Sequence, residues 1–313
     1  MKKFLTWVLL ILSSMHLVNA DAENLSAFGD LLVWHASQET ASTWANIVSE
    51  PQSKYVDFDA ANIDFGWNCG FRGGFGYQSQ SDQRNLELYW TYFPAKASSN
   101  FNMGEQIVIP EFFSGFVSDN LFFGANIDWQ IIMNMFDLEF GRKINIGRTL
   151  TLRPKIGIKT GTIRQKINSN WNAIIYTVTE QVKNNFFGIG PSFGIDSQWN
   201  LFNNISLIGD FSTALMWGNW SIKDTYNRPS ALFGVVTPTK ITTTMNQMQL
   251  GTMMFGYFMG FSWQHQGRAN VTLKVGYEMQ LWCNQLRMPT FQQLPVHGDL
   301  TLQGGTCHIR IDL

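Results

Sequence analysis

The chain has 313 residues, and its 22 Lys and Arg against 23 Asp and Glu give a net charge of −1 with neutral His. Proteins that bind nucleic acid usually carry a strongly basic face, so this balance indicates no partner of that kind. Mean hydropathy is −0.08, and nothing after residue 20 approaches the about 20 consecutive apolar residues of a membrane helix, which excludes helical membrane proteins.

The N-terminus has the pattern of a secretory signal peptide. Two lysines precede a short apolar run, Phe4 to Leu12, and a small-x-Ala cleavage site ends at Ala20. Residues 1–20 are therefore expected to be removed on export. The remaining residues, 21–313, are expected to form one domain.

Alternation of apolar and polar residues, the period of a β-strand, runs through this domain. The clearest strand is Asn270 to Asn284, whose odd positions are apolar while Lys274 and Glu278 lie on the opposite face. The same period predicts strands at Phe28 to Ser37, Trp67 to Tyr77, 86–92, 121–140, Leu150 to Thr162, Phe187 to Ile195, Ile205 to Trp217 and 248–264.

Two of these segments are less regular than the rest. Within 121–140 the apolar residues occupy odd positions as far as Met135 and even positions from Phe136, and this change of phase predicts a β-bulge. Within 248–264 Met, Phe and Gly are so frequent that the faces are hard to distinguish. We expect the odd positions from Met253 to Phe261 to face outward.

The last segment, Leu300 to Leu313, alternates between an apolar face and a face that carries His308, Arg310 and Asp312. Such a strand at the C-terminus is typical of an outer-membrane β-barrel, in which the last strand pairs with the first so that no backbone edge meets lipid.

The connections between the predicted strands alternate in length, as short periplasmic turns and longer external loops do in such barrels. The long connections are 38–65, 95–120, 164–185, 222–247 and 285–299, and the short ones are 78–84, 141–148, 199–204 and 265–269. The sequence therefore predicts an all-β fold, a transmembrane antiparallel up-and-down barrel in the outer membrane with both termini in the periplasm. It has ten strands, or twelve if residues 42–60 add a hairpin.

Charged residues within these strands are expected to face the lumen, because a charge on the lipid face is costly. The candidate pore-lining residues are Arg72, Glu87, Asp128, Arg153, Lys155, Lys159, Asp196, Asp210, Lys274, Glu278, Arg310 and Asp312. Their mixed signs predict no clear ion preference.

Motifs for catalysis, cofactors or metals are weak in this chain. The glycine-rich stretch from Gly70 to Gly76 lacks both the dinucleotide and the phosphate-loop spacing, and strand glycines facing a crowded lumen explain it better. No Cys and His spacing resembles a metal site. We therefore expect a protein that is not an enzyme and that binds no cofactor and no metal.

Three cysteines, Cys69, Cys283 and Cys307, remain after the signal peptide, so at least one has no partner within the chain. Two interpretations stand: small apolar residues on the lipid face, or disulfide links to other proteins of the cell envelope.

Seven segments in order from Asp30 to the end resemble the major outer membrane protein family of Legionella and chlamydia-like bacteria. They are Asp30 to Ala36 (DLLVWHA), Asn68 to Tyr77 (NCGFRGGFGY), Asp137 to Arg142 (DLEFGR), Leu150 to Ile158 (LTLRPKIGI), Phe187 to Gly194 (FGIGPSFG), Gly276 to Gln285 (GYEMQLWCNQ) and Gly298 to Leu313. The resemblance implies a pore-forming barrel of the outer membrane.

Two functions are compatible with these observations. The first is a porin, a water-filled channel through which small hydrophilic solutes and ions diffuse passively. The alternative is a surface structural or adhesive protein whose barrel anchors the binding loops 164–185 and 222–247. Either would lie among outer-membrane lipid and lipopolysaccharide, and either could associate as a homo-oligomer such as a trimer.

Overall fold

The computed structural model describes residues 23–39, 43–49, 57–79, 83–102, 106–110, 122–174, 176–202, 204–228, 239–265, 270–288 and 296–312. The expected signal peptide, 1–20, lies outside these residues. Within them the chain is built from strands: β1 (Glu23–Gln38), β2 (Thr43–Ser49), β3 (Asp57–Asn62), β4 (Trp67–Ser79), β5 (Arg84–Phe101), β6 (Ile107–Pro110), β7 (Gly124–Arg142), β8 (Ile144–Ile146), β9 (Leu150–Asn172), β10 (Thr177–Phe202), β11 (Ile205–Arg228), β12 (Thr239–His265), β13 (Asn270–Met288) and β14 (Val296–Asp312). No helix in the described part is long and apolar enough to cross a membrane.

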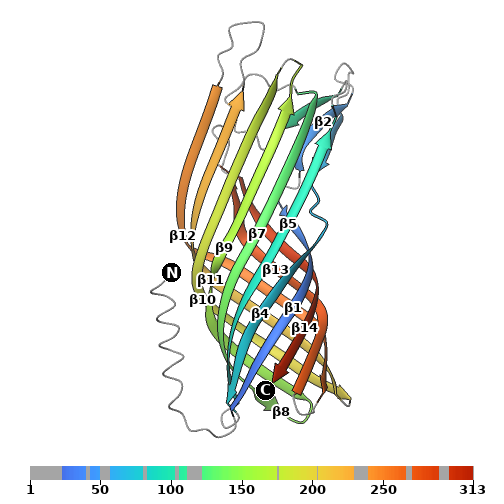
Figure 1. The fold of residues 1–313 in the computed structure, drawn as a ribbon, viewed down its shortest axis with the longest axis vertical. Helices are drawn as coiled ribbons and strands as arrows, with labels where there is room; N and C mark the ends of the chain where they lie inside the picture. The colour runs from blue at the N-terminus through green and yellow to red at the C-terminus, as the bar shows by residue number, and fades with distance from the viewer. Residues whose placement is uncertain are drawn as a thin grey trace.

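One antiparallel sheet closes into a barrel (Figure 1). It contains eleven strands, of which β8 is a short addition to β9, and the other ten follow one another around the wall in chain order. β14 pairs with β1 over the register from Asp312–Ser26 to Leu300–Gln38, so the last strand joins the first as expected. The predicted ten-stranded, up-and-down barrel is confirmed.

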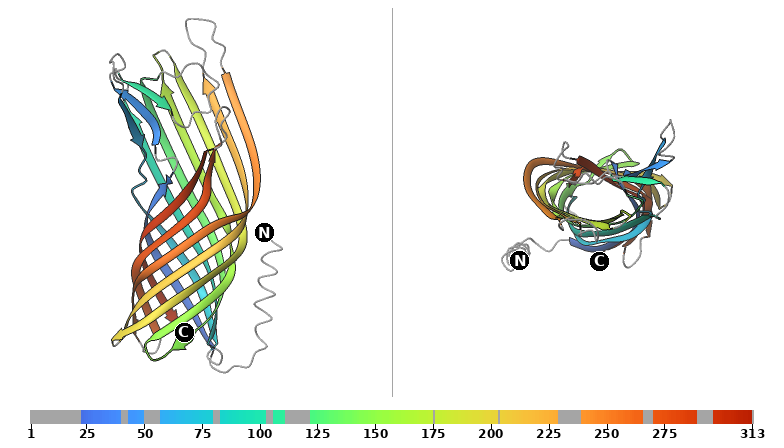
Figure 2. Two further views of the ribbon diagram at one scale, coloured as in Figure 1. Left: turned by 180° about the vertical axis from the view of Figure 1, so that it is seen from behind. Right: turned by 90° about the horizontal axis from the view of Figure 1, so that it is seen from above.

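The expected hairpin in 42–60 exists, but it does not enlarge the barrel. β2 and β3 pair with each other, and β2 pairs with β6, in a separate three-stranded sheet. This small sheet lies at the upper end of the molecule (Figure 2). The count of twelve strands is therefore wrong.

The long connections are shorter than the sequence pattern suggests, because the strands continue beyond the expected ends. Residues 164–172 belong to β9 and 177–185 to β10, with only the residues between Asn172 and Thr177 connecting them. β11 likewise continues to Arg228. Among the expected short connections, 141–148 is described throughout, and it joins β7 to β9 by way of β8.

Large apolar side chains cover the outside of one half of the barrel. We call this half the lower barrel. It contains β8 and the C-terminal end of β14, and it extends to a row aligned by strand register: Trp90, Phe136, Thr160, Ile189 and Trp217. Each of its ten strands contributes an exposed apolar residue: Leu31, Phe75, Leu88, Leu138, Ile156, Phe193, Phe211, Tyr257, Val275 and Ile309. A continuous apolar belt of this kind indicates a surface that faces lipid.

The upper barrel, beyond that row, has the opposite arrangement. Its interior is mainly a packed apolar core that includes Phe93, Trp129, Ile163, Phe186 and Trp220, each at most 1% exposed. A few charged residues, Glu180, Asp224 and Arg287, are buried with it. The small sheet contributes Trp44, whose ring centroid lies 5.5 Å from that of Trp171. Outward positions here are polar, as in a water-soluble β-protein.

β7 shows this reversal within one strand and corrects the predicted bulge. Its register with β5 and β9 is continuous, so no residue is inserted. Odd positions point inward throughout: Trp129 and Met135 join the apolar core, and Asp137 lies in the charged interior of the lower barrel. The phase changes because the interior changes from apolar to charged while the side chains keep their direction.

The upper barrel is an open, curved sheet, because pairing stops on two sides of it. β4 and β5 pair as far as Phe71–Tyr92, and β12 and β13 pair as far as Met254–Trp282. Six strands, β5, β7, β9, β10, β11 and β12, form this open sheet (Figure 1). β13, β14 and β1 also continue past those points, but they pair there with one another and not with the edges of the open sheet.

Glycines on the inner face of β4 allow neighbouring strands to approach closely. A Cβ atom on Gly74 would lie 2.4 Å from the backbone oxygen of Leu88, and one on Gly70 would lie 2.6 Å from that of Tyr92. This crowding accounts for the glycine-rich stretch without any phosphate-binding role.

Candidate functional site

The lower barrel encloses a cavity of about 430 Å³ whose lining includes fifteen charged side chains. The lining extends from Gln78 and Asn270, at the lower end of the barrel, to Met133 and Met254, at the edge of the apolar core. Eleven of the twelve predicted residues line it: Arg72, Glu87, Arg153, Lys155, Lys159, Asp196, Asp210, Lys274, Glu278, Arg310 and Asp312.

Asp128, the twelfth, is not in the cavity. It lies in the upper barrel on the outer face of β7 and is exposed, while its neighbours Ile127 and Trp129 are buried. The expectation that it faces the lumen is therefore wrong, because it assumed that the apolar face of β7 points outward along its whole length.

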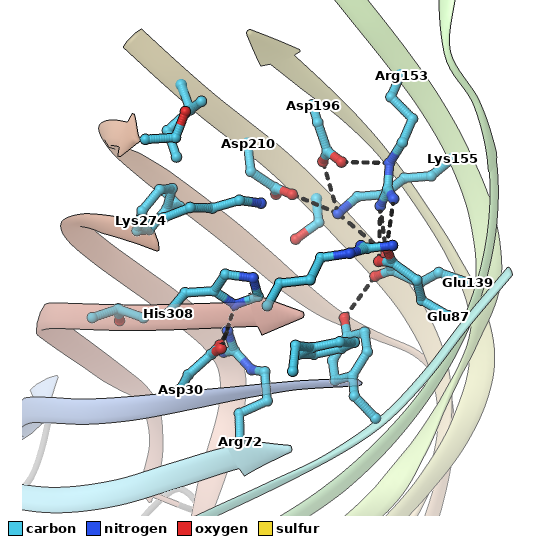
Figure 3. Close-up of a pocket in the computed structure, with 18 of the residues that line it drawn as sticks. Asp30, Arg72, Glu87, Glu139, Arg153, Lys155, Asp196, Asp210, Lys274 and His308 are labelled. Carbon is cyan, nitrogen blue, oxygen red and sulfur yellow. Dashed lines mark hydrogen bonds and ion pairs between the residues drawn. The ribbon is translucent and has the colours of Figure 1, made fainter. Parts of the chain in front are cut away.

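One group of charges centres on Arg153 and Lys155 of β9 (Figure 3). Arg153 contacts Glu87 at 3.1 Å and Asp196 at 2.6 Å. Lys155 contacts Glu139 at 3.3 Å and Asp196 at 3.0 Å, and it also pairs with Asp210. Because Glu87 comes from β5, Glu139 from β7, Asp196 from β10 and Asp210 from β11, the group joins five consecutive strands across the lumen.

A second group surrounds Arg72 of β4. Its guanidinium contacts Asp30 at 2.9 Å and Glu278 at 2.6 Å, and the other Glu278 oxygen accepts a hydrogen bond from Thr306 at 2.9 Å. His308 contacts Asp30 through Nδ1. Tyr89 lies between the two groups, because its hydroxyl donates a hydrogen bond to Glu139 and its ring centroid lies 5.8 Å from the Arg72 guanidinium. Arg310 extends the first group, at 2.7 Å from Glu87.

At the upper end of the cavity Lys159 pairs with Asp137, whose side chain is 1% exposed. The Lys159 amine also lies 6.0 Å from the ring centroid of Trp282, within cation–π range. This ion pair therefore lies at the boundary between the charged cavity and the apolar core.

Lys274 differs from the other cavity cations. In Figure 3 its side chain extends into the space between Asp210 and His308. Within the described residues it lines the cavity without contacting a carboxylate at ion-pair distance. Its positive charge is therefore not neutralised by a direct ion pair in this part of the chain.

The predicted set omits several polar residues of the cavity, among them Asp30, Tyr89, Asp137, Glu139, Lys143 and His308. The signal for Asp137 and Glu139 was present, since they alternate with Phe136, Leu138 and Phe140. Tyr89 donates a 2.6 Å hydrogen bond to Glu139, and its aromatic ring gave no indication of an inward direction.

One contact in the cavity resembles part of a hydrolytic triad. His308 and Asp30 are in contact, yet the other ring nitrogen of His308 has no hydrogen-bond partner among the described residues, so no nucleophile completes a triad there. No group of three His, Cys, Asp or Glu in this part of the chain is arranged to hold a metal ion.

The three cysteines form no disulfide with one another. Cys69 and Cys307 are exposed on outward positions of β4 and β14. This placement favours the first interpretation, small residues on the outer face of the wall.

Comparison with known proteins gives one family and several distant folds. The family model described as "Legionella pneumophila major outer membrane protein precursor" matches residues 21–312. No curated protein matches the chain.

Solved structures with similarity are outer-membrane proteins. The outer membrane protease OmpT from Escherichia coli is 8% identical, with 93% of this chain and 97% of that chain covered and a TM-score of 0.46. A Pseudomonas aeruginosa FadL homologue is 7% identical, with 93% and 90% covered and a TM-score of 0.27. An anion-selective porin from Comamonas acidovorans is 8% identical, with 93% and 99% covered and a TM-score of 0.22. With every TM-score below 0.5, these similarities carry no argument about function.

Proposed function

Since the chain belongs to the Legionella major outer membrane protein family and is an outer-membrane barrel, we propose that it is a porin, a channel for passive diffusion of ions and small hydrophilic solutes. The observation that carries the proposal is the charged cavity of about 430 Å³ inside the lipid-facing lower barrel. Buried charges are costly unless they are paired or hydrated. Lining the interior of a membrane-embedded wall with them is typical of an aqueous pathway.

The passage is expected to be narrow. Barrels of eight strands are filled by side chains, whereas those of 16 to 18 strands leave a wide aqueous channel, so ten strands lie near the filled limit. The apolar core of the upper barrel lies directly above the cavity. We therefore expect low conductance, with brief openings in which this core separates.

Ion selectivity is expected to be weak. The cavity lining contains eight Asp and Glu and seven Lys and Arg residues. With neutral His these sum to −1, and a nearly balanced wall favours neither anions nor cations strongly.

We propose that the upper barrel lies outside the cell and that both termini lie in the periplasm. The short turns at the lower end and the two longest connections at the upper end, from β1 to β4 and from β5 to β7, support this orientation. The test uses a variant without the three native cysteines, into which single cysteines are introduced. Cysteines at Asn168 and Asn227 are expected to react with a membrane-impermeant reagent on intact cells, whereas a cysteine at Asn145 is expected not to react. Labelling at Asn145 alone would show that the protein has the opposite orientation in the membrane.

Single-channel recording of the refolded protein in planar bilayers tests the channel. We expect discrete openings, and the variant Lys274→Glu should shift the reversal potential toward cation preference, because it replaces a positive charge of the cavity lining without removing an ion pair. The matched control is Arg148→Glu, an exposed residue at the lower end of the barrel outside the cavity lining. The absence of any single-channel current over a wide voltage range would contradict the proposal.

A second function, that of a surface structural or adhesive protein, is supported by one observation. The upper barrel combines a packed apolar core with a polar outer surface, as a rigid projecting body would. A silent bilayer together with binding of the intact protein to a host-cell or matrix surface would favour this alternative.

A further inference from the structure

Lysines of several strands lie in one row on the outside of the upper barrel. Strand register places Lys183 of β10 directly beside Lys166 of β9 and Lys223 of β11. The same row continues onto β7, where Gln130 is aligned with Lys166, and onto β5, where Lys96 is aligned with Gln130. We call Lys96, Lys166, Lys183 and Lys223 the lysine row.

All four lysines are exposed, and within the described residues none of them forms an ion pair. Adjacent strands are about 4.8 Å apart, and like charges directly opposite each other destabilise a sheet. Asp128, also exposed on the outer face, is aligned with Ser98 and Asn168, two residues along the strands from this row, so it is a diagonal neighbour of Lys96 and Lys166. Three adjacent lysines therefore repel one another with no acidic side chain of the described wall opposite them.

The row lies a short way above the lipid-facing belt. Phe187 is the last exposed aromatic residue on the outer face of β10, and Lys183 follows it on the same face four residues further up the strand. Four residues of a strand span about 13 Å. With the upper barrel outside the cell, this height is that of the headgroups and inner sugars of the outer leaflet, where lipopolysaccharide carries its phosphate groups.

We propose that the lysine row binds the phosphate groups of a phosphorylated glycolipid of the outer leaflet. Two ammonium groups on neighbouring strands can contact one phosphate, and Arg164, exposed on β9 two residues below Lys166, adds a guanidinium on the side nearer the lipid. The bound anion removes the repulsion within the row. The inference rests on the proposed orientation and is independent of channel activity.

Binding of purified protein to diphosphoryl lipid A in detergent micelles, measured by native mass spectrometry, tests the proposal. The triple variant Lys166→Gln, Lys183→Gln and Lys223→Gln is expected to bind at least tenfold more weakly than the native chain at about 0.1 M salt. The difference should decrease at higher salt, because exposed charges are screened. The matched control, Arg142→Gln, Arg148→Gln and Lys240→Gln, removes three exposed cations elsewhere and should bind as the native chain does.

Three further probes decide which source of anion is bound. Lipid A without its phosphates is expected to bind the native chain and the triple variant equally. Inorganic phosphate at millimolar concentration should not compete with diphosphoryl lipid A for the native chain. Equal binding of diphosphoryl lipid A by the native and triple-variant proteins would overturn the proposal. Binding of heparin as tight as that of lipid A, with the same loss in the triple variant, would also overturn it and assign the row to a soluble polyanion. A folded barrel is expected to resist SDS until it is heated, because its backbone hydrogen bonds lie between neighbouring strands. A shift in electrophoretic mobility on heating, shown by the native chain and by every variant, controls for folding.

Discussion

At the scale of single residues, burial and charge determine which side of the wall a side chain occupies. Lys155 and Ile156 are neighbours in β9, yet Lys155 lies among carboxylates of the cavity and Ile156 is 52% exposed on the apolar belt. Alternation in a strand forces this opposition. The eleven predicted residues that line the cavity belong to the lower barrel. There the outer face of each strand is apolar, so the charged face is expected to point inward.

The first prediction concerns Ile156. Replacing it with Lys is expected to lower the free energy of unfolding by about 2–4 kcal/mol, the cost of a charge on the lipid face near the bilayer midplane. The measurement is urea unfolding in phospholipid vesicles, with Ile156→Leu as the control that keeps the site apolar. Unchanged stability of the Lys variant would mean that Ile156 does not face lipid.

The second prediction concerns the ion pair at the top of the cavity. Lys159→Met leaves the Asp137 carboxylate, 1% exposed, without its cation and should destabilise the barrel by about 3–5 kcal/mol. Adding Asp137→Leu should restore most of that loss, since two apolar residues fit beside Trp282 and Met135. If the double variant loses as much free energy of unfolding as the single variants Lys159→Met and Asp137→Leu lose together, the two residues are not energetically coupled.

At the scale of elements, the sequence located the strands better than their ends. β9 was expected to stop near Thr162, but it continues to Asn172 with Ile167 and Trp171 turned inward. Alternation with a period of two shows that faces differ, yet it does not show which face is inside. Where lipid no longer covers the wall, the polar face of the strand lies outside. The sequence of such a strand end, with its many polar residues, resembles that of a loop. Asp128 was misplaced for this reason.

The upper part of β13 gives a prediction about closure of the passage. Its Arg287 guanidinium lies 3.7 Å from the ring centroid of Trp220 on β11, and the backbone oxygen of Gln285 accepts a 3.1 Å hydrogen bond from Asn184 on β10. These contacts hold β13 across the inside of the curved sheet. Arg287→Ala is expected to increase the frequency of channel openings several-fold.

The control for that prediction is Asn185→Ala, on the exposed outer face of β10. Opening frequencies that are the same in Arg287→Ala, Asn185→Ala and the native protein would show that β13 does not restrict the passage.

At the scale of the whole molecule, the distribution of polar and apolar residues between the inside and the outside of the barrel is inverted along its axis. The lower barrel has charges inside and apolar residues outside, and the upper barrel has apolar residues inside and polar residues outside. The fold class and the family follow from sequence, because ten alternating segments and seven ordered motifs are enough to specify them. The inversion does not follow, because it depends on where the membrane ends along each strand.

The accessibility of spin labels along β7 tests this inversion most directly. Single labels at 126, 128, 130, 136, 138 and 140, all at even positions of one strand, are introduced into the protein in lipid vesicles. We expect a water-soluble nickel chelate to reach the first three labels and oxygen dissolved in the bilayer to reach the last three, with all six mobile at the outer surface. Burial of the labels at 126, 128 and 130, inaccessible to both reagents, would mean that the strand changes face through a bulge, and it would contradict the account.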